Sequence, residues 1–481
     1  MSISRRINDL LDEGSFVEID EYVEHDCTYF GVDKKMARGD GLIAGYGTID
    51  GRRVCLYGHD STFLGGSSSK MHSLKIVKIL DLALKTGTPV IALNDSSGIR
   101  IHEGIDAGAH FGLVFFKTEK ASGVVPQISL ILGDCAGGAA YTPALNDFII
   151  MTEEHSNMFL TGPAVIKAAT GESVTKEQIG GASVHSERTG LAHFLARTES
   201  EALQLTRRLL SFLPQNNCTP ALPIKSEDTG TRKVFELKEI IPKDQNKAFD
   251  MLQVIQHVVD NRDFLEIHKR YAPNIVVGFA RVGGSTVGII GNQPNYLAGC
   301  LDIAASEKGA RFIRMCNAFN IPIISLIDVS GYLPGLSQET GGIIKSGAKL
   351  LHAYCEASVP KVAVILRKAY GGAYPTMANR GATDLCFALP NAEIAVMGSE
   401  GAVDVIFRKA IADADDPVGK REALVNEYRN KFASATYAAR KGYIDNIIDT
   451  EDMRNTLISS LALLETKISS EPLRRHSNIP L

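Results

Sequence analysis

The chain has 481 residues, of which 44% are apolar and 22% charged, and its formal net charge is -4. This length predicts two or three domains, and two large ones are the simpler division. Because the net charge is small and the Lys and Arg residues are scattered, the composition argues against nucleic acid and anionic membrane surfaces as partners.

The N-terminal segment, residues 1–16, mixes charges with isolated leucines and contains no apolar core of a signal sequence. Since no stretch reaches about 18 uninterrupted apolar residues, we expect no membrane insertion and a cytoplasmic location. The eight cysteines show neither a Cys-x-x-Cys pair nor regular spacing, which argues against zinc and against a disulfide framework. We therefore predict no metal in this chain.

The first strong structural signal lies between residues 63 and 98. The stretch "FLGGSSSKMHSLKIVKILDLALKTGTPVIALNDSSG" predicts a glycine turn, an amphipathic helix, an apolar strand and then Asp-x-Ser-Gly. Another apolar strand, residues 127–132, runs into "GDCAGGAAYTPA" at 133–144, where a helix is expected from about Ala140. The strands do not alternate between apolar and polar residues, which is typical of strands covered on both faces.

The composition changes in the middle of the chain. Residues 213–233 are polar and contain three prolines, which is typical of a linker. We therefore predict two domains, residues 1–230 and residues 231–481.

The second half of the chain repeats the first. "YLAGCLDIAASEKGARFIRMCNAFNIPIISLIDVSG" at 296–331 has the same order of turn, helix and strand, and "KVAVILRKAYGGAYPTMA" at 361–378 repeats the strand and its glycine turn. Asp95 matches Asp328 after 233 residues, and Gly138 matches Gly372 after 234. This nearly constant offset favours an internal duplication over two unrelated α/β domains that share glycine turns.

Each half is therefore predicted to be an α/β fold in which strands and helices alternate. Phe312, Cys316 and Phe319 are spaced by four and three residues, so they mark the buried face of one helix.

The two Gly-Gly-Ala turns are the candidate functional sites. Glycine allows a sharp turn and a close approach of the backbone to a ligand, and the N–H groups at the start of a helix attract an oxyanion. Each turn taken alone is also consistent with simple tight packing of a helix on a strand. Their duplication at equivalent positions favours two oxyanion sites, and hence a reaction between two anionic partners.

Neither turn is accompanied by a conventional catalytic group. The chain shows no Ser/His/Asp spacing, no Gly-x-Ser-x-Gly elbow and no Walker loop. Asp95 and Asp328 each precede a Ser-Gly or x-Ser-Gly segment at the end of a strand, so we expect them to be turn or helix caps and not acids. Catalysis by these turns would thus be electrostatic and not covalent.

A set of motifs extends over nearly the whole chain: "GDGLIAGYGTIDGR", "MHSLKIVKILDLALKTGTPVIALNDSSGIRIHEG", "ASGVVPQISLILGDCAGGAAYTPAL", "MFLTGPAVIKAATGE", "RKAYGGAYPTMA", "AEIAVMGSEGAV" and "HSNIPL". Together they resemble the carboxyltransferase β subunit of biotin-dependent acyl-CoA carboxylases of the propionyl-CoA carboxylase type. The resemblance implies two tandem crotonase-like ββα-spiral domains, the N-terminal one for acyl-CoA and the C-terminal one for biotin. It also implies a homo-hexamer built as a trimer of dimers.

The resemblance also implies the reaction and its partners. Carboxybiotin would arrive on a partner protein, a biotin carboxylase or biotin carboxyl carrier subunit, and react with a short acyl-CoA at a dimer interface. Loss of CO2 leaves a biotin enolate, which removes the α-proton of the acyl-CoA, and the resulting thioester enolate attacks CO2. No side-chain base is required.

Carried over by position, the resemblance assigns roles to individual residues. The N–H groups of Gly137 and Gly138 would hold the thioester oxygen, and those of Gly372 and Ala373 the biotin ureido oxygen. The substrate-binding residues would be those of the CoA-side loop, those lining the acyl end and the glycine of the second turn: Gly98, Ile99, Tyr141, Gly371, Tyr374 and Pro375.

Two departures from the family pattern leave the acyl group and the direction of the reaction open. Many propionyl-type relatives have Asp where this chain has Pro375, and they often have Gly and Ala where it has Ser97 and Ile99. A biotin-dependent decarboxylase or transcarboxylase would use the same sites. A non-catalytic CoA-binding scaffold is a third hypothesis, against which the two intact glycine turns argue.

Overall fold

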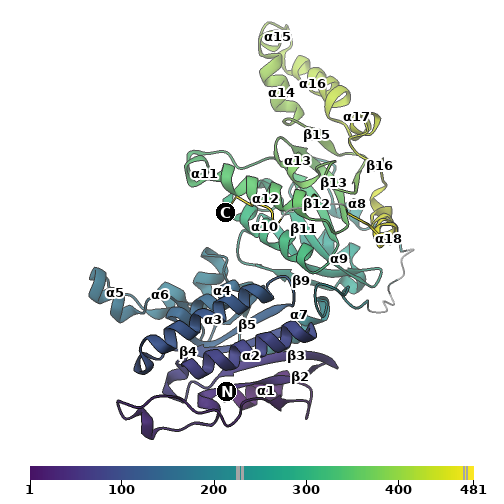
Figure 1. Cartoon of the computed structure of the whole chain (residues 1–481). Coiled ribbons are helices and arrows are strands. Elements are labelled where there is room, and N and C mark those ends of the chain that lie inside the picture. The colour runs from purple at the N-terminus through teal and green to yellow at the C-terminus, as the bar shows by residue number, and fades with distance from the viewer. Residues whose placement is uncertain (224–227, 229–231, 470–471, 473–474, 481) are drawn as a thin grey trace. The chain divides into compact units, whose positions relative to one another are not determined.

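The computed structural model describes residues 1–223, 228, 232–469, 472 and 475–480. The chain forms two compact units: Met1–Leu222 with His268–Tyr271, and Pro223–Ile267 with Ala272–Leu481. The domain boundary predicted near residue 230 lies outside the described residues. Figure 1 gives the labels of the elements in each unit.

The first unit contains eight strands and seven α-helices among its described residues. Its strands are β1 (Val17–Glu18), β2 (Leu42–Ile49), β3 (Arg52–His59), β4 (Val90–Ser96), β5 (Gln127–Ala136), β6 (Phe148–Thr152), β7 (Asn157–Phe159) and β8 (Phe194–Ala196). Its helices are α1 (Ile3–Leu10), α2 (Lys70–Thr86), α3 (Ile105–Ala121), α4 (Tyr141–Leu145), α5 (Pro163–Thr170), α6 (Lys176–Gly180) and α7 (Glu199–Phe212).

In the part of the second unit that the structure describes there are also eight strands, with a larger set of helices. Its strands are β9 (Phe264–Ile267), β10 (Ile275–Val282), β11 (Ser285–Asn292), β12 (Ile323–Val329), β13 (Lys361–Tyr370), β14 (Leu385–Ala388), β15 (Glu393–Ala395) and β16 (Asn446–Ile447). Its helices are α8 (Leu237–Ile240), α9 (Met251–Val258), α10 (Ile303–Ala318), α11 (Leu336–Gly341), α12 (Ile343–Glu356), α13 (Ala373–Met377), α14 (Ser399–Ile406), α15 (Arg408–Ala412), α16 (Pro417–Tyr428), α17 (Ala435–Arg440) and α18 (Met453–Leu464).

The two sheets have the same topology. The first runs β1-β2-β3-β4-β5-β6-β8 with β7 beside β5, and the second runs β9-β10-β11-β12-β13-β14-β16 with β15 beside β13. In both sheets the first three strands are antiparallel and the later pairs are parallel. This strand-by-strand match confirms the internal duplication that the sequence predicts.

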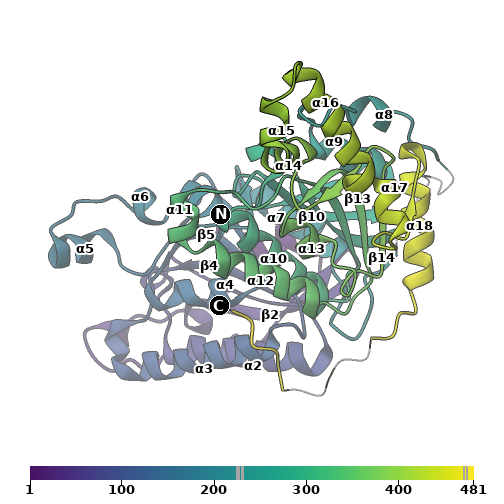
Figure 2. The ribbon, with the colours of Figure 1, turned by 90° about the horizontal axis from the view of Figure 1, so that it is seen from above.

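The central strands are buried on both faces, as their unbroken apolar sequence predicts. Every residue of β12 is buried, and so are the first five of β4 and the first six of β5. Figures 1 and 2 show α2 and α3 side by side against one sheet, and α10 and α12 side by side against the other. Phe312, Cys316 and Phe319 are all buried, which confirms the predicted face of α10.

Equivalent residues begin and end the long helices of the two units. The Ser69 hydroxyl accepts the N–H of His72 at the start of α2, and the Asp302 carboxylate accepts the N–H of Ala305 at the start of α10. α2 ends at Gly87, which has a φ of 61°. The matching residue after α10 is Asn320, with a φ of 55°. Asparagine can take the place of glycine here because it tolerates a positive φ better than most residues.

Strand β5 changes its neighbour along its length, and β13 does the same. Residues 128–131 of β5 pair with β6, whereas residues 134–136 pair with β7. Residues 362–365 of β13 pair with β14, and residues 368–370 pair with β15. The residues between the two pairings bulge, so each strand is bent shortly before its Gly-Gly-Ala turn.

The segment that follows β15 forms a helical extension, α14–α17, which is longer than the segment with α5 and α6 that follows β7 in the first unit. Helices α14, α15 and α16 stand apart from the sheet of their own unit (Figures 1 and 2). Within the described part of the chain, none of the helices combines the length and the apolar character needed to cross a bilayer.

Candidate functional site

The first Gly-Gly-Ala turn lies at the carboxyl end of β5. Gly137 has a φ of 59°, a conformation that glycine adopts far more easily than other residues. A short 3₁₀-helix, Gly137–Ala140, follows and leads directly into α4. Because the first N–H groups of a helix have no acceptor within it, the chain here places donors at the end of the strand.

The second turn repeats this geometry at the carboxyl end of β13. Gly371 has a φ of 57°, and its N–H donates to the oxygen of Ala395 at 3.0 Å. The N–H of Gly372 has no acceptor among the residues that the structure describes, and Ala373 begins α13. The turn therefore offers a free backbone donor beside a helix N-terminus.

A loop from the preceding strand lies against each turn. Gly98 has a φ of 104°, and a Cβ at this position would lie 2.9 Å from the oxygen of Ala136. The next residue, Ile99, covers Gly138, since a Cβ on Gly138 would lie 3.1 Å from Ile99 Cδ1. The loop of Gly98 and Ile99 therefore lies directly against the first turn.

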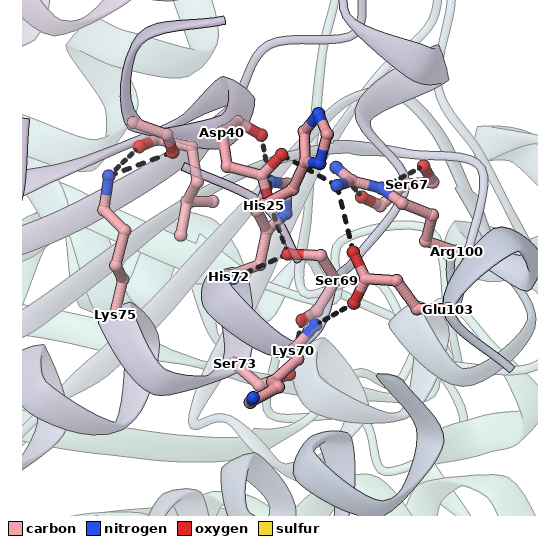
Figure 3. A network of polar contacts seen from close by, with 12 residues as sticks. His25, Asp40, Ser67, Ser69, Lys70, His72, Ser73, Lys75, Arg100 and Glu103 are labelled. Carbon is pink, nitrogen blue, oxygen red and sulfur yellow. Dashed lines mark hydrogen bonds and ion pairs between the residues drawn. The ribbon is translucent and has the colours of Figure 1, made fainter. Parts of the chain in front are cut away.

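A buried ionic network anchors the loop of Gly98 and Ile99. The guanidinium of Arg100 is fully buried; its Nη1 donates to Asp40 Oδ1 at 2.7 Å and to Glu103 Oε1 at 3.3 Å. Its Nη2 donates to the backbone oxygen of Ser67 at 3.1 Å. Figure 3 shows these contacts, together with the Ser69 hydroxyl that donates to the other oxygen of Asp40. Arg100, the residue after Ile99, is therefore held by two carboxylates and by Ser67.

The remaining predicted substrate-binding residues lie next to the turns. Tyr141 begins α4 and is half-exposed, and its ring meets Phe115 edge-on at 6.0 Å between centroids. Tyr374 is partly buried, and burial raises the pKa of its hydroxyl to about 12. Pro375 is exposed. The predicted residues thus form two groups, one at each turn.

The side chains near the turns are not set up as nucleophiles. Burial raises the pKa of Cys135 to about 12, and its thiol donates to the oxygen of Ala139. Asp134 forms an ion pair with Lys176. Within the described ranges, His, Cys, Asp and Glu side chains form no group of three or more that could hold a metal ion.

Tyr332 also lies at the second turn, although it is not among the residues predicted from the sequence. It occupies the place of Ile99 in the duplication, and a Cβ on Gly372 would lie 3.7 Å from its ring. Its hydroxyl lies 3.1 Å from that of Thr376, and burial raises the pKa of this phenol. The offset of 233 residues from Ile99 was the signal that could have identified it.

The expectation that Asp95 and Asp328 act as turn or helix caps is wrong. Asp328 forms a buried ion pair with Arg367, with 2.6 Å between the charged atoms, and Asp95 pairs with Arg6 at 3.1 Å. The sequence suggested capping because it shows only near neighbours, whereas Arg6 and Arg367 are distant from their aspartates along the chain.

Comparison with known proteins identifies the family of this chain. The carboxyl transferase domain family matches residues 1–479. The chain is 48% identical over 482 residues to the methylmalonyl-CoA decarboxylase subunit alpha of Propionigenium modestum, covering 100% of this chain and 93% of the relative. It is 49% identical over 482 residues, with the same coverage, to the propionyl-CoA carboxylase carboxyltransferase subunit of Haloferax mediterranei.

The fold is also that of a solved relative. The transcarboxylase 12S structure with methylmalonyl-coenzyme A and methylmalonic acid bound is 48% identical to this chain, with a TM-score of 0.97. The match covers 100% of this chain and 92% of that one. The crotonase-like fold and the resemblance to carboxyltransferase β subunits are confirmed. The chain therefore belongs to the carboxyl transferase family, and it is a carboxyltransferase.

Proposed function

We propose that this protein is the carboxyltransferase component of a biotin-dependent acyl-CoA carboxylase and acts on a short acyl-CoA. The observation that carries the proposal is the repetition of one Gly-Gly-Ala turn at equivalent strand ends of two duplicated units. A reaction between two substrates that both develop an oxyanion needs two such sites. Relatives named for propionyl-CoA and methylmalonyl-CoA support an acyl group of that size.

Each turn has a separate role in this proposal. The N–H groups of Gly137 and Gly138 hold the thioester oxygen of acyl-CoA, and the CoA-side loop of Gly98 and Ile99 limits the space beside them. Carboxybiotin, delivered on a carrier protein, supplies the CO2. Preorganised donors of this kind stabilise a developing negative charge by several kcal/mol. Biotin that has lost its CO2 would accept the α-proton of the acyl group, so no side-chain base is required.

The biotin side uses the second turn. The N–H groups of Gly372 and Ala373 hold the ureido oxygen, beside Gly371, and the unpaired N–H of Gly372 fits such an acceptor. Tyr332 lies against this turn, and Tyr374 and Pro375 follow it on α13, close to where the acyl end is expected. Tyr141 has the equivalent place after the first turn.

Reconstitution tests the proposal. The purified protein is incubated with a biotin carboxylase, a biotinylated carrier, ATP, bicarbonate and acetyl-, propionyl- or butyryl-CoA. Carboxylation of one thioester is the expected result. Absence of transfer to every acyl-CoA, with a carrier shown to be carboxylated, would favour the non-catalytic scaffold.

Decarboxylation or transcarboxylation is a second candidate, because the relatives include a decarboxylase subunit and a transcarboxylase subunit at similar identity. It is tested with methylmalonyl-CoA and a biotinylated carrier, by following the carboxyl group onto the carrier. An enzyme of this kind would load the carrier faster than it carboxylates propionyl-CoA under matched conditions.

We also propose a homo-hexamer, as in the transcarboxylase 12S structure described as a hexamer assembly. Light scattering should then give a mass six times that of the 51.9 kDa chain. A cytoplasmic location stays a prediction, to be checked by fractionation.

A further inference from the structure

The bulge before each Gly-Gly-Ala turn is occupied by an aspartate. Asn94 pairs with Ile131 and Ser96 pairs with Cys135, so Asp95 lies opposite the three residues 132–134 of β5. Asp328 alone faces three residues of β13 in the same way. Because the turn follows within a few residues, the shape of the bulge determines where the N–H groups of the turn point.

In the second unit, the side chains of Asp328 and Arg367 pack together at the bulge between β12 and β13. Asp328 Oδ1 accepts the N–H of Lys368 at 2.9 Å, and Oδ2 accepts Arg367 Nη2 at 2.6 Å. The other terminal nitrogen of Arg367 donates to the oxygens of Asp244 and Lys247 at 2.9 and 2.6 Å. Both charged side chains are completely buried.

In the first unit, the arginine comes from a different part of the chain. The residue equivalent to Arg367 is Gly133, and a Cβ here would overlap the Asp95 carboxylate. Arg6 of α1 reaches the bulge instead: Nη1 donates to Asp95 Oδ2 at 3.1 Å, and Nη2 donates to the oxygen of Leu132 at 3.0 Å. The same guanidinium also pairs with Glu199 of α7, through Nε at 3.1 Å and Nη2 at 2.6 Å. A guanidinium therefore joins the aspartate and the bulged backbone in both units, although Arg6 and Arg367 are not duplicates of one another.

We propose that these two Asp-Arg pairs are positioning devices, with Arg6 and Asp95 aiming the first turn and Arg367 and Asp328 the second. A buried ion pair is often no better for stability than apolar residues of the same volume. Stability alone therefore does not explain why both units place an arginine beside the aspartate of the bulge, from α1 in the first unit and from β13 in the second. This inference rests on the proposed function, in which the two turns hold different substrates.

The test uses the whole protein with one arginine replaced at a time, as Arg6→Met or Arg367→Met. The control is Arg454→Met, which removes another fully buried guanidinium, paired with Asp260 at 2.7 Å, from an ion pair that lies on neither bulge. Three properties are measured: hydrogen exchange of peptides spanning 133–141 and 367–377, the KM and kcat for acyl-CoA, and CO2 release from a carboxylated carrier without acyl-CoA.

Arg6→Met should speed exchange in 133–141 by roughly ten-fold and leave 367–377 within about two-fold of the wild type. It should lower kcat/KM for acyl-CoA by up to roughly 10²-fold while CO2 release without acyl-CoA is retained. Arg367→Met should show the reverse pattern in exchange and lose CO2 release. Arg454→Met should change neither peptide selectively.

Equal effects of both variants on both turns, or a fall in thermal stability with unchanged exchange and kinetics, would overturn the proposal. If the wild type itself transfers no carboxyl group, the proposed function fails. The exchange pattern then still decides whether the pairs position the turns, so the two failures are distinguishable.

Discussion

The side chain of Ile99 covers Gly138, and a Cβ on this glycine would lie 3.1 Å from Ile99 Cδ1. This distance is shorter than an ordinary van der Waals contact between carbon atoms. The equivalent pair in the second unit, Tyr332 and Gly372, leaves 3.7 Å for the same atom. The space above the first turn is therefore the tighter of the two.

Gly138→Ala should displace Ile99 and with it the loop of Gly98 and Ile99, which we propose binds acyl-CoA. The backbone of Gly138 has no positive φ, so the cost is steric: overpacking of this kind costs about 1 kcal/mol or more. Since the N–H of the residue is kept, we expect a higher KM for acyl-CoA and an unchanged KM for the carboxylated carrier. Steady-state kinetics with each substrate varied in turn measure the difference.

The double variant Gly138→Ala with Ile99→Ala should recover most of this loss, because the clashing atoms are removed. Gly112→Ala in α3 is the matched control, since a Cβ at that glycine meets no atom within 4 Å. A double variant as impaired as Gly138→Ala alone would show that Ile99 is not the cause.

Ala373→Pro tests the backbone donor of the second turn. Ala373 is the first residue of α13, so a proline there removes no hydrogen bond within the helix. Because Gly372 before it has a φ of -66° and a ψ of -19°, which a following proline disfavours, the folding of the variant is checked by its thermal midpoint. Removing one oxyanion donor costs roughly 10²-fold in rate. Ala373→Gly keeps the N–H and should retain most activity. A folded and fully active Ala373→Pro enzyme would contradict the proposed role.

The repeated elements were predictable because they carry local signals. The apolar strands, the amphipathic helices and the glycines of both turns all follow from residue types at fixed spacing. The constant offset between the halves made even the equivalence of the two turns visible. These features depend on neighbours within a few residues.

The partners across the fold were not predictable in the same way. Nothing near Arg6 in the sequence indicates that it reaches Asp95, 89 positions later. Asp95 and Asp328 therefore seemed to be caps, because a local hydrogen bond is the simplest role that spacing can suggest. Tyr332 was missed because an isolated tyrosine carries no periodic signal.

Glu393 links the second turn to the helical extension of its unit. Its buried carboxylate accepts the hydroxyl of Tyr370, next to Gly371, at 2.9 Å and that of Ser399 in α14 at 3.1 Å. Arg429 Nε donates to it at 2.6 Å. Glu393→Ala would leave these donors without their acceptor, at a cost of roughly 2–3 kcal/mol.

We expect this variant to lower the unfolding midpoint in urea and to loosen α14–α17, as followed by proteolysis. Glu393→Gln keeps an oxygen acceptor for the two hydroxyls and should lose less. Equal midpoints for Glu393→Ala and the wild type would show that the extension is held by other contacts.

His59 should make the first unit sensitive to mild acid. Its ring is buried and lies 5.9 Å from that of His72, and burial lowers the pKa of His59 to about 4. In the unfolded chain a histidine binds its proton near pH 6.5. As the pH falls from about 6.5 toward 4, the unfolded state takes up a proton that the folded state does not bind, so stability falls.

This contribution is fully present above pH 6.5, and roughly 2 kcal/mol of it is lost at pH 5. His59→Asn should remove this part of the acid sensitivity without a large steric change, whereas His72, whose pKa is also lowered by burial, keeps its own part. The equivalent residue of the second unit is Asn292, which fits between the oxygen of Gly299 and the N–H of Asp328. Thermal unfolding at pH 7 and pH 5 checks this, with exposed His155→Asn as the control. If His59→Asn and the wild type lose the same number of degrees between the two pH values, the buried ring is not the acid-sensitive group.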